Sequence, residues 1–188
     1  MLSLISITLL YVLLVEMTNA NLCPPGTYQS NTNATSSNNC LKCPIGTYQQ
    51  FNGYSSCNIC PTGTYCVGTG AMGVHYCPSG TYQPNTGATA ADACLKCPIG
   101  TFQQFNGYSS CNICPPGAYC LDIGATSVYY CPAGTYQPRT GVISAEACLQ
   151  CPPGTFQQYS GSSRRNECPA GYSCIDPAKS PTPLSNQS

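Results

Sequence analysis

The sequence is poor in charge. Only 6% of its 188 residues are Asp, Glu, Lys or Arg, and six basic and six acidic side chains give a formal net charge of zero. Nucleic acids and anionic membranes attract proteins that carry a field of positive charge. This chain has neither a basic field nor an acidic tail, so we expect no nucleic acid and no anionic membrane surface among its partners.

Candidate catalytic groups are equally few. His75 is the single histidine, and its segment from Cys60 to Tyr76 contains no carboxylate. Asp92 and Glu146 each stand without a second carboxylate nearby. Acid–base catalysis needs a positioned donor or acceptor with a tuned pKa. We therefore expect His75 to lie on a loop, either hydrogen-bonded or facing solvent, and the protein to be no enzyme and to use no cofactor.

Long apolar runs are missing after the N-terminus. The segment Leu2–Val15 is mostly apolar and is followed by Thr18-Asn19-Ala20, which is typical of a signal peptide cleaved after Ala20. The run is shorter than the roughly 20 residues that span a bilayer. We predict a signal peptide over 1–20, a secreted extracellular protein and no membrane span in the mature chain; the alternative is a cell-surface protein held by a signal anchor.

Cysteine, in contrast, is abundant. All 17 cysteines lie after residue 20, and at this density a secreted chain is a disulfide scaffold. Loss of Glu16 with the signal peptide leaves six basic and five acidic residues, so the mature net charge is +1. Large aliphatic residues are few, so covalent bridges must replace a hydrophobic core.

The cysteines belong to a strict repeat. The segment from Cys43 to Cys60 recurs from Cys97 to Cys114 with one change, Tyr48 to Phe102, and a more divergent copy runs from Cys151 to Cys168. The spacing between successive Cys-Pro-x-Gly tetrapeptides follows the order 20, 17, 17, which sums to a period of 54 residues. Such a period indicates a linear array in which each unit packs on its neighbours. The tetrapeptide begins at Cys23, Cys43, Cys60, Cys77, Cys97, Cys114, Cys131, Cys151 and Cys168.

Each unit begins with a turn. Proline and glycine after a tethered cysteine favour a tight turn, and the following Thr-aromatic pair favours a short strand. We expect each ring to pack on the disulfide of its own or the preceding unit. A second turn is expected at Asn52-Gly53, Asn106-Gly107 and Ser160-Gly161. The predicted fold is a small disulfide-rich one, with tandem short β-hairpin units stacked as an elongated rod and little or no helix, at most one turn each over Thr89–Cys94 and Ser144–Cys148.

The period defines the expected organisation. After the signal peptide, we predict cysteine-rich repeats over 21–76, 77–130 and 131–174. One further period from Cys131 leads to Ser185, where no new tetrapeptide begins. The segment 175–188 is rich in Pro and Ser and lacks an apolar pattern, so we expect a disordered tail.

The pattern CPxGTY…C-x2-C-PxGTY…G…C-x2-C over Cys23–Cys174 is similar to the ephrin type A/B receptor-like cysteine-rich repeat. More distantly it resembles tumour-necrosis-factor-receptor and EGF-like modules. Such modules occur in receptor ectodomains, secreted matrix proteins and surface proteins. The resemblance implies an extracellular module and does not imply a ligand.

The cysteine spacing also resembles two other kinds of site. Cys40-x2-Cys43-x13-Cys57-x2-Cys60 is close to a zinc-ribbon spacing. The signal peptide, the single histidine and the Cys-Pro-x-Gly register favour oxidised cysteines instead, so we expect no metal site. A thioredoxin-like Cys-x-x-Cys works at a helix start in an α/β fold, which this sequence does not predict.

The number of cysteines is odd because Arg165 stands where the earlier repeats have Cys57 and Cys111. An interlaced ladder resembling tumour-necrosis-factor-receptor modules, with 40–57 and 43–60 paired, leaves Cys148 alone. The strict repeat of loop lengths favours closure within units, which leaves Cys151 as the unpaired thiol and a point for a disulfide-linked dimer. The within-unit pairs are Cys23–Cys40, Cys43–Cys57, Cys60–Cys66, Cys77–Cys94, Cys97–Cys111, Cys114–Cys120, Cys131–Cys148 and Cys168–Cys174.

Asn33-Ala34-Thr35 is an N-glycosylation acceptor in a Ser/Asn-rich loop, so we predict a glycoprotein modified at Asn33. Arg164-Arg165 is the one local basic pair, and we interpret it as a solvated turn. The predicted function is a non-catalytic extracellular binding or spacer module whose partner is an unidentified extracellular protein or glycan. The alternative is a crosslinked structural component of an extracellular matrix or wall.

Overall fold

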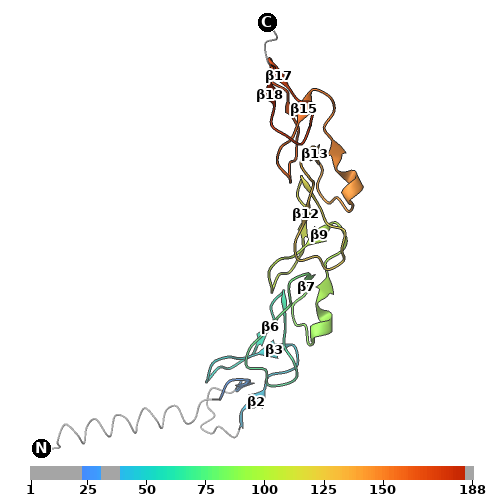
Figure 1. The fold of residues 1–188 in the computed structure, drawn as a ribbon. Coiled ribbons are helices and arrows are strands. Elements are labelled where there is room, and N and C mark those ends of the chain that lie inside the picture. The colour runs from blue at the N-terminus through green and yellow to red at the C-terminus, as the bar shows by residue number, and fades with distance from the viewer. Residues whose placement is uncertain (1–22, 31–38, 185–188) are drawn as a thin grey trace, which may run out of the picture. The chain divides into compact units, whose positions relative to one another are not determined.

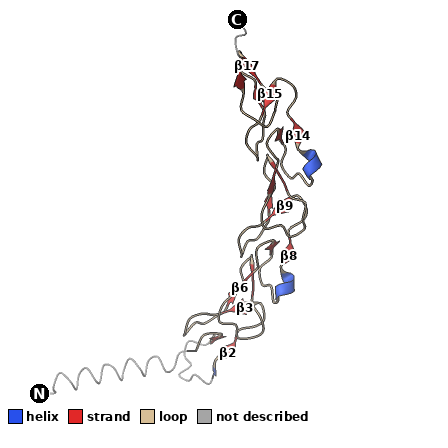
Figure 2. Cartoon of the chain, viewed as in Figure 1, coloured by secondary structure: helices blue, strands red, loops and turns tan. Residues whose placement is uncertain are grey.

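The building block of the structure is a hairpin of two very short antiparallel strands. The computed structural model describes residues 23–30 and 39–184, and in this part of the chain nine separate two-stranded sheets follow one another (Figure 1). Every strand is two residues long, so the loops and turns make up most of each unit (Figure 2). The chain divides into two compact parts, the first formed by 1–77 with 83–94 and the second by 78–82 with 95–188.

The first compact part contains three hairpins. In each, the strand that follows a Cys-Pro-x-Gly turn pairs with the strand that leads into the next one; for example, Thr47 lies opposite Ile59. A single turn of 3-10 helix, η2 (Ala91–Ala93), belongs to the same compact part. The strand pairs are β1 (Thr27–Tyr28) with β2 (Leu41–Lys42), β3 (Thr47–Tyr48) with β4 (Asn58–Ile59), and β5 (Thr64–Tyr65) with β6 (His75–Tyr76).

The second compact part contains six hairpins of the same kind and a second 3-10 turn, η3 (Ala145–Ala147). The strand pairs are β7 (Thr81–Tyr82) with β8 (Leu95–Lys96), β9 (Thr101–Phe102) with β10 (Asn112–Ile113), β11 (Ala118–Tyr119) with β12 (Tyr129–Tyr130), β13 (Thr135–Tyr136) with β14 (Leu149–Gln150), β15 (Thr155–Phe156) with β16 (Asn166–Glu167), and β17 (Tyr172–Ser173) with β18 (Thr182–Pro183).

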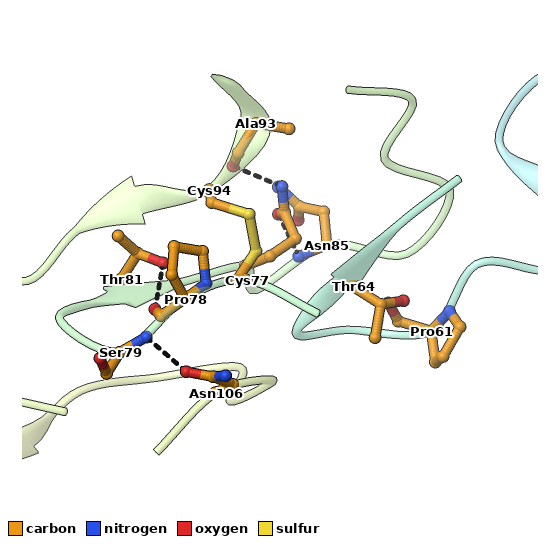
Figure 3. Close-up of a disulfide and its surroundings, with 11 residues drawn as sticks. Pro61, Thr64, Cys77, Pro78, Ser79, Thr81, Asn85, Ala93, Cys94 and Asn106 are labelled. Atoms are coloured by element: carbon orange, nitrogen blue, oxygen red, sulfur yellow. Dashed lines mark hydrogen bonds between the residues drawn. A yellow bond between two sulfur atoms is a disulfide. The ribbon is translucent and has the colours of Figure 1, made fainter. Parts of the chain in front are cut away.

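The turn that opens each unit explains the repeated tetrapeptide. In the unit that begins at Cys77, the Thr81 backbone N–H and hydroxyl both donate to the carbonyl of Pro78, at 3.1 and 2.6 Å (Figure 3). The third residue of this turn, Gly80, has a φ of +77°, which side chains other than glycine's rarely adopt. Proline is therefore the first residue of the turn, and the glycine supplies the unusual backbone angle.

Half-cystines are the commonest buried side chains in the described residues. The aliphatic residues buried in the described part of the chain are two alanines, Ala118 and Ala125. Eight disulfides close loops with sequence separations of 17, 14 and 6 residues, and they stand where a larger protein would have a hydrophobic core. The bridges are Cys23–Cys40, Cys43–Cys57, Cys60–Cys66, Cys77–Cys94, Cys97–Cys111, Cys114–Cys120, Cys131–Cys148 and Cys168–Cys174.

Within each of the two compact parts, backbone contacts join some hairpin units to units that follow them. Gly46 has a φ of +79°, and a Cβ built on it would lie 2.6 Å from the carbonyl oxygen of Gly87. Gly100 and Gly141 make the same approach one period later, at 2.9 Å. Because a side chain at either position would collide with backbone, these glycines are needed for close packing as well as for their turns.

The predicted fold class is confirmed: the chain is a series of small disulfide-rich hairpins, and the described residues contain no α-helix. The single helical turns expected over Thr89–Cys94 and Ser144–Cys148 are present as η2 and η3. No helix in the described residues is long and apolar enough to cross a membrane.

Two expectations need correction. Phe102 packs against a cluster in the following unit, formed by Cys114, Ala118 and Cys120, because its partner strand β10 leads directly into Cys114. The segment 175–184, expected to be part of a disordered tail, contains β18, in which Thr182 lies opposite Ser173 of β17. A backbone ladder needs no apolar side-chain pattern, so the composition of this segment did not reveal the strand.

Candidate binding surface

Two nearly identical loops project between paired strands. The first loop covers residues 49–57, between β3 and β4, and the second loop covers residues 103–111, between β9 and β10. Each is closed at its C-terminal end by a disulfide to the cysteine that opens its unit, Cys43–Cys57 and Cys97–Cys111. The frames of both loops are therefore covalently fixed.

A buried glutamine supports the first loop from inside. Gln49 is 0% exposed, its Nε2 donates to the Ser56 carbonyl at 3.0 Å, and its Oε1 accepts from the Phe51 N–H at 3.0 Å. The Gly53 N–H also donates to the Cys23 carbonyl at 2.8 Å, which joins the loop to the preceding unit. A buried amide must be fully hydrogen-bonded to be stable, so Gln49 holds the two sides of the loop at a set spacing.

Gln103 repeats this arrangement in the second loop. It is 0% exposed, donates to the Ser110 carbonyl at 3.0 Å and accepts from the Phe105 N–H at 3.1 Å. Here the side chain of Asn106 accepts a hydrogen bond from the Ser79 N–H at 2.8 Å (Figure 3). The second loop is thus also held by the unit before it.

The outer side of each loop carries a pair of exposed aromatic rings. Phe51 and Tyr54 are 54% and 49% exposed, with ring centroids 6.0 Å apart. Phe105 and Tyr108 are 55% and 47% exposed, with centroids 6.1 Å apart. The intervening residues are Asn and Gly, two serines follow, and neither loop contains a charged residue. Tyrosine, serine, glycine and asparagine dominate antibody binding loops, where rigid rings provide contact area and small polar groups adapt their hydrogen bonds.

The third equivalent loop, 157–165, has changed. Tyr159 is 67% exposed, but serine replaces the second ring at position 162, and the end of the loop carries Arg164 and Arg165. Both arginines, with Tyr136 and Glu167, line a hollow of about 440 Å³. Arg164 and Arg165 are exposed, and this loop is charged where the first two are neutral.

The sequence-predicted site residues are distributed as follows. The structure pairs sixteen cysteines within units and leaves Cys151 as a free thiol that is 8% exposed. Burial raises the pKa of this thiol, while a hydrogen bond from Thr155 and the charge of Arg165 act in the opposite direction. The signal peptide and Asn33 lie outside the described residues.

The structure also gives the positions of the zinc-ribbon candidates and of His75. The sulfur atoms of Cys40, Cys43, Cys57 and Cys60, the zinc-ribbon candidates, are all in disulfides. Within residues 23–30 and 39–184, no group of three or more His, Cys, Asp or Glu side chains is placed to hold a metal. His75 is exposed and stacks on Tyr65, with centroids 5.2 Å apart.

Sequence reasoning missed the buried glutamines and the exposed ring pairs. The signal for the glutamines was present, because Gln follows each Thr-aromatic pair in six of the units and Cys takes its place in the three units with short bridges. The sequence signal for the ring pairs is that Phe51 and Tyr54 recur as Phe105 and Tyr108 in the second repeat, at positions outside the predicted turns and strands. They were missed because their exposure depends on where the loop lies in three dimensions.

Disulfide-linked hairpins without a conventional core define a class of cysteine-rich extracellular modules. The family model described as tyrosine-protein kinase ephrin type A/B receptor-like matches residues 32–76, 88–131 and 129–168. The matches cover more than half of the chain, and the protein belongs to this family of cysteine-rich repeats. No curated protein matches the chain.

Proposed function

We propose that the protein is a secreted, non-catalytic binding module that uses the first and second loops to hold an extracellular partner. The observation that carries this proposal is the recurrence of an exposed aromatic pair on a rigid, uncharged loop, at 51/54 and again at 105/108. Exposed rings on a fixed frame lose little conformational freedom on binding, which favours affinity. Because both loops are neutral, we expect a partner surface, on a protein or a glycan, that is also neutral.

We also propose the organisation inferred from the period: a signal peptide over 1–20, repeats over 21–76, 77–130 and 131–174, within-unit disulfides in the mature protein and a glycan on Asn33. Two loops of one kind allow bivalent attachment, and linked sites raise the overall affinity without new contacts. The cysteine-rich frame then acts as the spacer that carries them.

The test compares a loop variant with a matched control. The loop variant carries Phe51→Ala, Tyr54→Ala, Phe105→Ala and Tyr108→Ala. The control carries Leu41→Ala and Leu95→Ala, which remove side chains that are 54% and 48% exposed at one matched position of both repeats. Binding of the labelled mature proteins to the native cell surface and matrix is measured as a function of concentration.

Truncating an aromatic anchor commonly costs about 2 kcal/mol of binding free energy, so we expect the loop variant to bind at least about a hundredfold more weakly than the wild type. The control should bind like the wild type. Equal binding by the loop variant and the wild type would show that these loops are not the binding surface.

The second candidate function is a matrix or wall component crosslinked through the odd cysteine. The free thiol favours it, but Cys151 is 8% exposed and so is poorly placed to meet a second chain. A ladder of reducible oligomers on a non-reducing gel would support the matrix function, whereas a single monomer band would support the binding module.

A further inference from the structure

The short disulfides in the first two repeats are covered by a later segment of the chain. In the first repeat, the Gly87 N–H donates to the Cys60 carbonyl at 2.7 Å, and the Cys66 N–H donates to the Ala88 carbonyl at 2.9 Å. The Gly63 N–H donates to a third acceptor, the carbonyl of Gln83, at 2.8 Å. One segment, residues 83–89, thus closes over the Cys60–Cys66 bridge, and both cysteines are 0% exposed.

The second repeat makes the same three bonds. The Cys114–Cys120 bridge is covered by residues 137–143 and is likewise 0% exposed. The bonds are Gly141 N–H to Cys114 carbonyl at 2.8 Å, Cys120 N–H to Val142 carbonyl at 2.9 Å, and Gly117 N–H to Gln137 carbonyl at 2.7 Å.

The third short disulfide, Cys168–Cys174, has no such cover. Within the described residues, the Cys168 carbonyl and the N–H groups of Gly171 and Cys174 take part in none of the three equivalent bonds. A Cβ built on Gly154, the counterpart of Gly46 and Gly100, would meet nothing within 4 Å. This open site, which we call the terminal socket, includes a hollow of about 340 Å³ lined in part by Gly154, Cys174 and Ile175.

The exposure of Ile175 shows how much apolar surface is open at this site. It is 93% exposed, whereas its counterparts Val67 and Leu121, beside covered bridges, are 57% and 43% exposed. A branched apolar side chain left in water costs free energy that burial would recover. The terminal socket therefore combines backbone groups that have no backbone partner among residues 23–30 and 39–184 with an exposed apolar side chain, as an unpaired sheet edge does.

The segment that fits this socket is present near the start of the chain. Residues 29–35 read QSNTNAT, and residues 83–89, which cover the first bridge, read QPNTGAT, so five of seven positions are identical. Gly87 has a φ of +74°, and asparagine, which stands at the matching position 33, is among the residues that best tolerate such an angle. The Gln29 carbonyl accepts none of the inter-unit backbone bonds found in the described residues.

We propose that the terminal socket binds residues 29–35 of a second copy of this chain, head to tail, as a continuation of the interface between its own repeats. The expected bonds are Gly171 N–H to the Gln29 carbonyl, Asn33 N–H to the Cys168 carbonyl, and Cys174 N–H to the Ala34 carbonyl. The contact is heterologous, so it adds copies one after another, in an open series or, where the rotation between copies allows, in a ring. The glycan proposed above for Asn33 would occupy the contact and stop this addition, so the proposal concerns chains in which Asn33 is unmodified.

The experiment uses the mature protein produced without N-glycans and measures its mass by sedimentation velocity over concentrations up to ~1 mM, where contacts of a few kcal/mol become visible. Ile175→Asp disables the socket, and Asn33→Pro removes the N–H donor and the positive φ from the inserted segment. Ile123→Asp is the matched control, because Ile123 is 69% exposed and does not line the socket.

We expect the wild type and Ile123→Asp to form a concentration-dependent series of oligomers. Each of the other two variants should lower the association constant at least about tenfold. Mixed together, they should form a one-to-one dimer that grows no further, because one supplies an intact socket and the other an intact segment. A wild type that stays monomeric, an Ile175→Asp variant that associates normally, or a mixture that fails to pair would each overturn the proposal.

Discussion

Arg165 Nη1 donates a hydrogen bond to the hydroxyl of Tyr136 at 2.9 Å, and the guanidinium lies 5.4 Å from the centre of the same ring. In the two earlier repeats this position is a cysteine bridged to the start of its unit, as in Cys43–Cys57. The third repeat therefore has a polar contact to a neighbouring hairpin where the others have a covalent bond. Its remaining thiol, Cys151, stays buried.

Restoring the lost cysteine should restore the bridge. Arg165→Cys places a cysteine 14 residues after Cys151, the separation of the two equivalent bridges. In the chain-entropy model, a disulfide that closes a loop of this length raises the free energy of unfolding by about 3 kcal/mol. Loss of the Arg165–Tyr136 hydrogen bond lowers it by roughly 1 kcal/mol. We expect a higher denaturation midpoint and no free thiol. Arg164→Cys, one residue out of register, should show neither effect.

Cys151 should react slowly with alkylating agents while the protein is folded. The thiolate is the nucleophile, and burial raises the pKa of this thiol, so its reaction should begin at a higher pH in the folded than in the denatured protein. Because the folded pKa is the higher one, the contribution of this group to stability is complete below the unfolded pKa and is lost as pH rises through the folded pKa. Mass spectrometry of labelled peptides over a pH series measures the pH at which labelling of Cys151 begins in the folded and in the denatured protein. A label on Cys148 instead of Cys151 would contradict the within-unit pairing.

The buried glutamines should be essential to the loops. Gln103→Leu leaves the Phe105 N–H and the Ser110 carbonyl without partners, and each unsatisfied buried group costs about 1–3 kcal/mol. We expect a lower denaturation midpoint and faster amide exchange across 103–111. Gln104→Leu is the control because Gln104 is exposed. Unchanged exchange in Gln103→Leu would mean that the disulfide alone holds the loop.

The fold should depend on its bridges and be indifferent to chelators. Eight disulfides with loop separations of 6 to 17 residues hold residues 23–30 and 39–184, in which almost no aliphatic side chain is buried. Dithiothreitol should abolish the far-UV signal and open the chain to protease, while EDTA should change neither. Unfolding by EDTA alone would restore the zinc interpretation.

Secretion is tested at the N-terminus. The apolar run and the small residues before Asn21 predict that cells release the protein into the medium with Asn21 as its first residue. N-terminal mass spectrometry of the medium and the membrane fraction decides this. An intact N-terminus in the membrane fraction would favour the signal anchor.

What the sequence by itself determined are the local features. A Cys-Pro-x-Gly turn, a Thr-aromatic strand and a fixed period are properties of neighbouring residues, so the disulfide-rich class and the hairpins from β1–β2 to β15–β16 follow from the order of amino acids. Even the single helical turns at η2 and η3 were visible in this way.

Only the tertiary structure decided which of these residues are buried and which remain open. Gln49 looks like a polar surface residue, yet it is buried, because hydrogen bonds to both sides of its loop compensate for lost water. The pairing of β18 with β17 depends on backbone groups that every sequence has. The exposure of Gly154 and Ile175 depends on contacts that the same sequence pattern makes in the first two repeats and does not make in the third. Burial is set by what packs against a residue from elsewhere in the chain, and a local pattern does not contain that information.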